Sequence, residues 1–221
     1  MKTNRLLIIL IAAMPALATA APPGHGDLQR ATHAKPDIEH GSALFAGCVS
    51  CHGSQGGGQE NGNTPRIAGQ HYPVLLKQLV DFRHGKRWDF RMEEQADEHH
   101  LATPQDIADV AAYVSQLDFG GVRGIGNGER ATDGARIFGS RCASCHGPSG
   151  EGDAREVVPR LGGQHYGYLV RQMYDAVDRR RPTLQTVHPR QIAPLDFEEV
   201  RAVADYLARI EWTAPETGRA P

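Results

Sequence analysis

The sequence Cys-Val-Ser-Cys-His at residues 48–52 returns at residues 142–146 as Cys-Ala-Ser-Cys-His. These two stretches contain all four cysteines of the 221-residue chain. A C-x-x-C pair alone is compatible with a redox disulfide, with half of a zinc site or with a covalently bound cofactor, so the residue that follows it decides between them. Here a histidine follows directly in both stretches.

A C-x-x-C-H motif is typical of covalent haem attachment, in which two thiols bond to the haem and the adjacent histidine becomes a ligand of the iron. Two disulfides would be the ordinary use of four cysteines in an exported protein, but they would not need the histidines. Structural zinc would need a second ligand pair at finger spacing from either motif, and the sequence has none. We therefore predict two haem c groups, held by Cys48, Cys51 and His52 and by Cys142, Cys145 and His146.

The first twenty residues have the pattern of a secretory signal. Lys2 and Arg5 precede an apolar run over residues 6–17, and residues 18–20 read Ala-Thr-Ala, a small-residue cleavage pattern. The apolar run is shorter than the roughly 20 residues that cross a bilayer, which disfavours an uncleaved membrane anchor. We therefore expect an exported protein cleaved near Ala20, whose formal net charge falls from -2 to -4 when the two basic residues are removed. Nothing in it resembles the basic stripe of a nucleic-acid binder.

The sequence around the two motifs is repeated as well, at an offset of 93 or 94 residues. Pro-Arg-Ile-Ala-Gly-Gln-His-Tyr at residues 65–72 corresponds to Pro-Arg-Leu-Gly-Gly-Gln-His-Tyr at residues 159–166. Between Phe119 and Arg130, glycines interrupt the pattern. The predicted segments are a signal peptide (1–20), a flexible N-terminal segment (21–37), a first haem domain (38–119), a linker (120–130), a second haem domain (131–212) and a tail (213–221).

Each repeat has the apolar spacing of helices, and no run of strict alternation predicts a sheet. Thr103 and Pro104 are the expected N-cap and first residue of a helix that reaches Leu117. Asp196 opens its counterpart, and two amphipathic helices are predicted over residues 72–82 and 166–177. The predicted fold class is all-α, with helices packed around one haem in each domain.

These motifs resemble the cytochrome c4 family, which are dihaem class I cytochromes c with two domains in tandem. The resemblance covers roughly residues 38 to 212. It implies electron transfer in the periplasm, with redox proteins as partners: a respiratory complex, a terminal oxidase or a periplasmic oxidoreductase, through which the protein could associate with a membrane. It also implies that the carbonyls of Pro65 and Pro159 accept hydrogen bonds from His52 and His146.

The sixth iron ligand is expected to differ between the two domains. In domain 1, residues 85–92 read Gly-Lys-Arg-Trp-Asp-Phe-Arg-Met and match the family segment that ends in the axial methionine, which points to Met92. Residues 93–100 are then expected to form a loop of more than the usual length. The rival ligands in this domain are three histidines, His84, His99 and His100.

Domain 2 has no methionine at the corresponding place, because Met173 aligns with Leu79 on the apolar stripe of a helix. The family's methionine lies about seven residues before the leucine that leads into the last helix, and counting back from Leu195 reaches His188. We therefore expect His146 and His188 to bind the second iron, at a lower potential than the first. The alternative is a surface histidine, with iron 2 open or bound elsewhere.

The sequence thus predicts an electron carrier and not an enzyme. The alternative is an electron-relay or catalytic dihaem subunit of an enzyme that oxidises or reduces a small inorganic anion, such as a thiosulfate dehydrogenase or a dihaem peroxidase. Both cysteine pairs are used by haem attachment, which leaves none for the thiolate ligand of thiosulfate dehydrogenases. The chain is also shorter than dihaem peroxidases.

Overall fold

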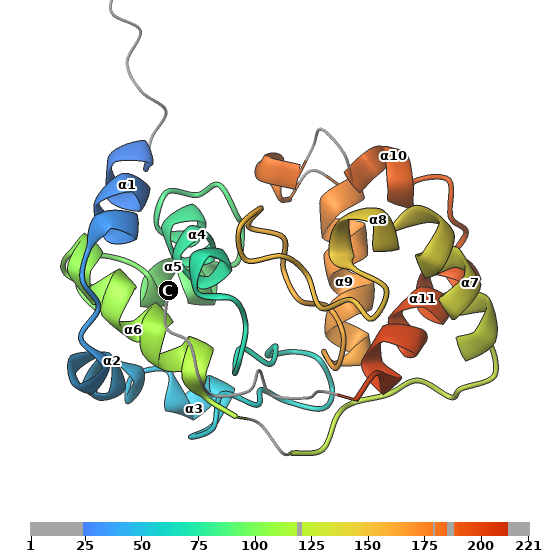
Figure 1. Ribbon diagram of the computed structural model, residues 1–221, viewed down its shortest axis with the longest axis horizontal. Helices are drawn as coiled ribbons and strands as arrows, with labels where there is room; N and C mark the ends of the chain where they lie inside the picture. The colour runs from blue at the N-terminus through green and yellow to red at the C-terminus, as the bar shows by residue number, and fades with distance from the viewer. Residues whose placement is uncertain (1–23, 119–120, 179, 185–187, 212–221) are drawn as a thin grey trace, which may run out of the picture.

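The computed structural model describes residues 24–118, 121–178, 180–184 and 188–211, and it consists of two helical halves side by side (Figure 1). The first half contains α1 (His25–His33), α2 (Ile38–Phe45), α3 (Val49–His52), α4 (Tyr72–Arg83), α5 (Phe90–Gln95) and α6 (Pro104–Gln116). The second contains α7 (Ala131–Arg141), α8 (Ala143–His146), α9 (Tyr166–Val177), the 3₁₀ helix η1 (Pro182–Leu184), α10 (His188–Ile192) and α11 (Phe197–Arg209). The described residues contain no strand beyond one isolated bridge, Asp153 with Val158. The predicted all-α class is confirmed, whereas the predicted signal peptide and tail lie outside the described residues.

In each half the helix that precedes the C-x-x-C-H turn crosses the last helix at a glycine. A Cβ atom added to Gly41 in α2 would lie 2.1 Å from the carbonyl oxygen of Asp109 in α6. A Cβ atom added to Gly134 in α7 would lie 2.0 Å from the carbonyl oxygen of Ala202 in α11. The two helices can approach this closely only where the side chain is a hydrogen atom. A tilted aromatic pair packs beside each crossing: Phe45 with Tyr113, and Phe138 with Tyr206.

The last helix of each half begins where its capping residues predict. Thr103 accepts a hydrogen bond from the N–H of Asp106, and the Asp106 side chain accepts one from the Thr103 N–H. Asp196 and Glu199 form the same capping box before α11. Each box satisfies two N–H groups that a helix start leaves without partners, and a cap of this kind contributes about 1 kcal/mol.

The segment predicted as flexible, residues 21–37, contains a helix. Helix α1 packs on α4 and α6, and its Ala31 is fully buried. Asp27 anchors it to α4, because its carboxylate accepts a hydrogen bond from His84 Nε2 at 2.7 Å and lies 3.7 Å from Arg83. The sequence does not predict this helix, because a helix with a single buried alanine shows no apolar stripe.

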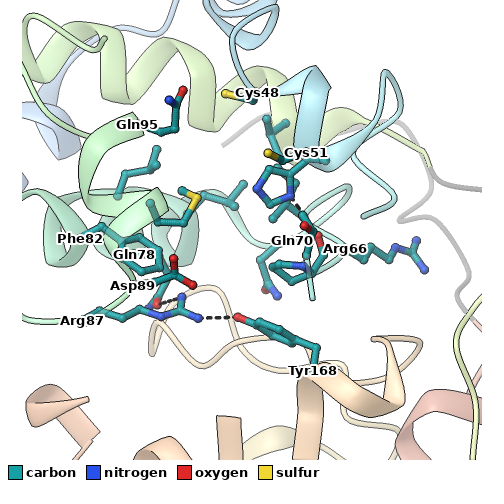
Figure 2. A pocket seen from close by; sticks show the side chains of 18 of the residues that line it. Cys48, Cys51, Arg66, Gln70, Gln78, Phe82, Arg87, Asp89, Gln95 and Tyr168 are labelled. Carbon is teal, nitrogen blue, oxygen red and sulfur yellow. Dashed lines mark hydrogen bonds between the residues drawn. The ribbon is translucent and has the colours of Figure 1, made fainter. Parts of the chain in front are cut away.

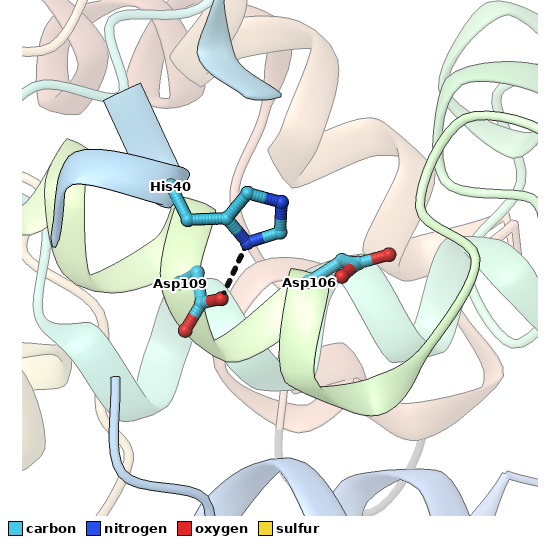
Figure 3. Close-up of side chains that lie close together, drawn as sticks. All are labelled: His40, Asp106 and Asp109. Carbon is cyan, nitrogen blue, oxygen red and sulfur yellow. Dashed lines mark hydrogen bonds and ion pairs between the residues drawn. The ribbon is translucent and has the colours of Figure 1, made fainter. Parts of the chain in front are cut away.

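A second polar contact ties α2 to α6 (Figure 3). His40 Nδ1 donates to Asp109 Oδ2 at 2.8 Å, while Asp109 Oδ1 accepts from the Asp37 N–H at 2.8 Å. Asp106 lies beside this pair. The buried Asp109 carboxylate is therefore satisfied by groups from the start of α2.

Helix α11 holds the second half of the linker, at Gly126 and Gly128. Both carboxylate oxygens of Asp205 accept backbone N–H groups of the linker, from Gly126 at 2.9 Å and from Gly128 at 2.7 Å. Arg209 closes the arrangement by donating to Asp205 at 2.9 Å and to the Gly126 carbonyl at 2.8 Å. The glycine-rich stretch predicted as a linker thus follows a fixed path over domain 2.

Candidate haem sites

The two C-x-x-C-H motifs form matching short helices, α3 and α8. His52 Nδ1 donates to the Pro65 carbonyl at 3.0 Å, and His146 Nδ1 donates to the Pro159 carbonyl at 3.1 Å. Both rings are buried, and burial lowers the pKa of each histidine despite the bond to its carbonyl. A neutral imidazole with its Nδ1–H engaged leaves Nε2 as the free lone pair, which is the form that a metal requires.

A cavity of about 400 Å³ lies in front of His52 and reaches the other domain. Apolar side chains of α4, of α6 and of the loop before α6 form much of its wall: Val74, Leu75, Leu79, Phe82, Leu101 and Val110. In Figure 2, Cys48 and Cys51 lie on one side of this space, and Arg87, bonded to Gln78 and to Tyr168 of domain 2, lies on the opposite side. An apolar space with two thiols and an imidazole at one side and a cation at the other fits a haem, whose ring is apolar and whose carboxylates are at one edge.

Met92 lines the same cavity as His52. It is carried by α5, a helix that sequence analysis missed, so the loop expected from residue 93 begins later, after Gln95. The rival histidines are engaged elsewhere or exposed: His84 binds Asp27, His100 binds Asp97 at 3.0 Å, and His99 is exposed. None of the three lines the cavity.

His188 is the first residue of α10, which packs on α9 as α5 packs on α4. Its ring centroid lies 6.1 Å from that of His146, with an angle of 64° between the ring planes. Burial lowers the pKa of His188, and the neighbouring His146 and Arg181 lower it further. Met173, by contrast, packs among apolar residues of α9 and α11.

The domains meet through pairs of residues that correspond in the repeat. Gln164 bonds to the backbone of Arg66, and Gln70 bonds in the same way to the backbone of Arg160. His71 Nε2 donates to the Glu151 carbonyl at 2.8 Å, as His165 Nε2 donates to the Gly57 carbonyl at 2.7 Å. Sequence analysis found the repeated Gln-His-Tyr but assigned it no role. Two polar residues that are repeated outside any helix pattern were the sequence signal that could have indicated an interface.

Two repeat-related arginines share two repeat-related glutamines at this interface. Arg87 donates to Gln78 and, at 2.8 Å, to Gln172. Arg181 donates to Gln172 at 2.9 Å and to Gln78 at 3.1 Å. Burial and the proximity of Arg87 lower the pKa of Arg181. A pair of cations in this setting is a favourable place for carboxylates.

Two helical domains, each with a C-x-x-C-H turn and a proximal histidine oriented by a proline carbonyl, define a tandem c-type cytochrome. The Cytochrome c family model matches residues 38–118 and again residues 131–211. Cytochrome c4 of Pseudomonas aeruginosa is 34% identical over 79% of this chain and 89% of its own length. The Thiosulfate dehydrogenase electron acceptor of Stutzerimonas stutzeri is 31% identical over 74% of this chain and 78% of its own.

Solved structures of the same kinds of protein are also similar to this chain. Reduced cytochrome c4 from Pseudomonas stutzeri superposes with a TM-score of 0.71 at 29% identity, covering 80% of this chain and all of that one. Thiosulfate dehydrogenase TsdBA from Marichromatium purpuratum gives 0.67 at 32% identity over 79% of this chain and 40% of its own. The chain belongs to the cytochrome c4 family, which confirms the predicted family, and it is an electron-transfer protein with two haem c groups. Within the described residues, no helix has the length and apolarity to cross a membrane.

Proposed function

We propose that this protein is a periplasmic one-electron carrier with two differently ligated irons. Haem 1 is attached to Cys48 and Cys51 and its iron is bound by His52 and Met92. Haem 2 is attached to Cys142 and Cys145 and its iron is bound by His146 and His188. Two observations support this proposal: Met92 lines the same cavity as the buried, carbonyl-bonded His52, and the ring of His188 lies beside that of the buried, carbonyl-bonded His146.

The separation of the two imidazoles in domain 2 supports their assignment to one iron. Metal–nitrogen bonds of about 2 Å on opposite sides of one ion, with half a ring beyond each nitrogen, place two ring centroids about 6 Å apart. The centroids of His146 and His188 are 6.1 Å apart.

The bound haems would supply the single-electron chemistry, and the side chains that bind the irons would set the direction of electron transfer between them. The imidazole of His188 stabilises ferric iron better than the thioether of Met92, so domain 2 has the lower potential. Electrons are therefore expected to pass from domain 2 to domain 1. Arg87 and Arg181 would hold the haem carboxylates at the interface and balance their charge.

A periplasmic oxidoreductase is the partner that the comparisons support best. The similarity to a Thiosulfate dehydrogenase electron acceptor and to TsdBA suggests that this chain takes electrons from an enzyme of that class. A catalytic role in the same reaction is the second candidate. All four cysteines lie in the two haem motifs, so none remains as a thiolate ligand. Co-purification, followed by reduction of this protein by thiosulfate with and without the enzyme, distinguishes relay from catalysis.

A potentiometric titration monitored by visible spectroscopy tests the proposal as a whole. We expect two one-electron steps, two low-spin haems and a weak far-red band from one methionine-bound iron. Mass spectrometry should show a mature chain with two covalent haems and without its signal peptide. A single haem, free thiols or a high-spin haem in the isolated protein would contradict the assignments.

A further inference from the structure

Gln70 and Gln164 each hold the backbone of the opposite domain with both ends of the side-chain amide. Gln164 Oε1 accepts the Arg66 N–H at 2.9 Å, and its Nε2 donates to the Arg66 carbonyl at 2.8 Å. Gln70 Oε1 accepts the Arg160 N–H at 2.9 Å, and its Nε2 donates to the Arg160 carbonyl at 3.0 Å. Both glutamines also accept the N–H of the histidine that follows them, which fixes their orientation.

The contacted N–H groups belong to the peptides that orient the proximal histidines. The Arg66 N–H is part of the same peptide group as the Pro65 carbonyl, which accepts the hydrogen bond of His52 at 3.0 Å. The Arg160 N–H is likewise part of the peptide group of the Pro159 carbonyl, which accepts that of His146 at 3.1 Å. Each proximal imidazole is thus connected, through one peptide group, to a glutamine of the other domain.

We propose that each glutamine tunes the iron of the opposite domain: Gln164 acts on haem 1 and Gln70 acts on haem 2. Hydrogen bonds that share a peptide group polarise one another, so donation by the N–H makes the carbonyl a stronger acceptor. A stronger acceptor at Nδ1–H makes Nε2 a better donor to the metal, and a better donor favours ferric iron. The domain interface therefore contributes to the reduction potentials of both haems. The glutamines act as positioning residues, and this inference rests on the proximal ligands named in the proposed function.

The experiment is a pair of crossed substitutions, Gln164→Leu and Gln70→Leu, followed by redox titrations that resolve the two haems. Gln164→Leu should raise the ratio of reduced to oxidised haem 1 about threefold at fixed potential, or about 28 mV at 59 mV per tenfold, and leave haem 2 unchanged. Gln70→Leu should raise the same ratio for haem 2 by the same factor and leave haem 1 unchanged. A shift confined to the haem of the mutated domain, equal shifts in both haems, or no shift would overturn the proposal.

A matched control separates this effect from a looser interface. Arg171 also crosses the interface, donating to the carbonyls of Gly62 and Asn63, but it does not contact the peptides that follow Pro65 or Pro159. Arg171→Lys keeps the charge and loses the paired geometry, so both potentials should stay as in the wild type. A crossed shift in this variant would assign the effect to domain contact in general.

If the leucine variants do not assemble, Gln164→Glu replaces them. Its carboxylate still accepts the Arg66 N–H, more strongly than an amide, so haem 1 should shift to lower potential by more than haem 2 does. An absent or equal shift would overturn the proposal. Spectra of each variant report axial ligation separately: unchanged ligation with unmoved potentials refutes only the tuning, whereas ligands other than the proximal histidines would refute the proposed function as well.

Discussion

The two domains have the same proximal turn and the same helix crossing, but they differ at the residue that we propose as the sixth iron ligand. In domain 1 this residue is Met92, on a helix that packs against α4. In domain 2 it is His188, on a helix that packs against α9. In the proposed function the scaffold around each iron is thus repeated, while the potential of each iron depends on a single side chain of a short helix.

Removing the histidine of domain 2 should have the largest effect. His188→Ala removes the proposed sixth ligand of iron 2, while Met173 is partly buried and packs against the apolar clusters of domain 2. We expect one of the two haems to become high-spin and to bind carbon monoxide, as measured by visible and electron paramagnetic resonance spectra. Unaltered low-spin signals from both haems would show that His188 is not a ligand.

Removing the methionine of domain 1 should change the other haem alone. With Met92→Ala, the far-red band of the methionine-bound haem should disappear and the potential of one haem should fall, because the thioether that favours ferrous iron is lost. Visible spectroscopy and a redox titration measure both effects. If the band persists in this variant, the ligand is another residue.

Substitution of the glycine at the helix crossing should destabilise both domains to a similar extent. Gly41→Ala and Gly134→Ala each place a methyl group against a backbone oxygen, and we expect each to lower the free energy of unfolding by about 1–3 kcal/mol. Gly139→Ala in α7 is the matched control, because no atom outside the local backbone of its own helix lies within 4 Å of the added Cβ. Chemical denaturation of the holoprotein measures the three variants, and equal stabilities for Gly134→Ala and Gly139→Ala would contradict the packing argument.

The smallest predicted difference is a pH dependence confined to domain 1, where His40 binds Asp109. Bonding to Asp109 raises the pKa of His40, so this contact stabilises the fold fully below pH 6.5 and is lost as the pH rises through the raised value. Burial opposes ionisation of Asp109, but hydrogen bonds from Asp37, His40 and Gln105 hold its pKa below 3.8, so its contribution is lost only in strong acid.

Melting temperatures of the wild type and His40→Gln at pH 5.5 and pH 8 test this pair. The difference between the two proteins should be greatest at pH 5.5 and shrink at pH 8. The repeat offers an internal comparison, since Ala202 stands where domain 1 has Asp109 and no such pair exists there. A constant difference across this range would assign His40 a role that does not depend on its charge.

The parts of the structure that the sequence predicts are those that have a recognisable local sequence pattern. The haem motifs are chemical requirements at fixed spacing. Helices α4, α6, α9 and α11 have apolar stripes, and α6 and α11 also have capping boxes, so the sequence predicts all four helices. Helix α5 has no buried residue and α1 has only one, so neither shows a helical stripe. The glutamine contacts join residues that are 98 and 90 positions apart, and no local pattern encodes such a pairing.

The reciprocal glutamine contacts have the symmetry of an isologous dimer, in which residue i of one copy meets residue j of the other and the reverse. Two identical single-domain chains could form the same interface, but both copies would then necessarily carry the same axial ligand. Joining the copies in one chain, with a linker held by Asp205, removes that constraint, because each half can then change without the other. Covalent fusion thus permits a built-in polarity, with unlike ends, that a symmetric pair of identical subunits could not have.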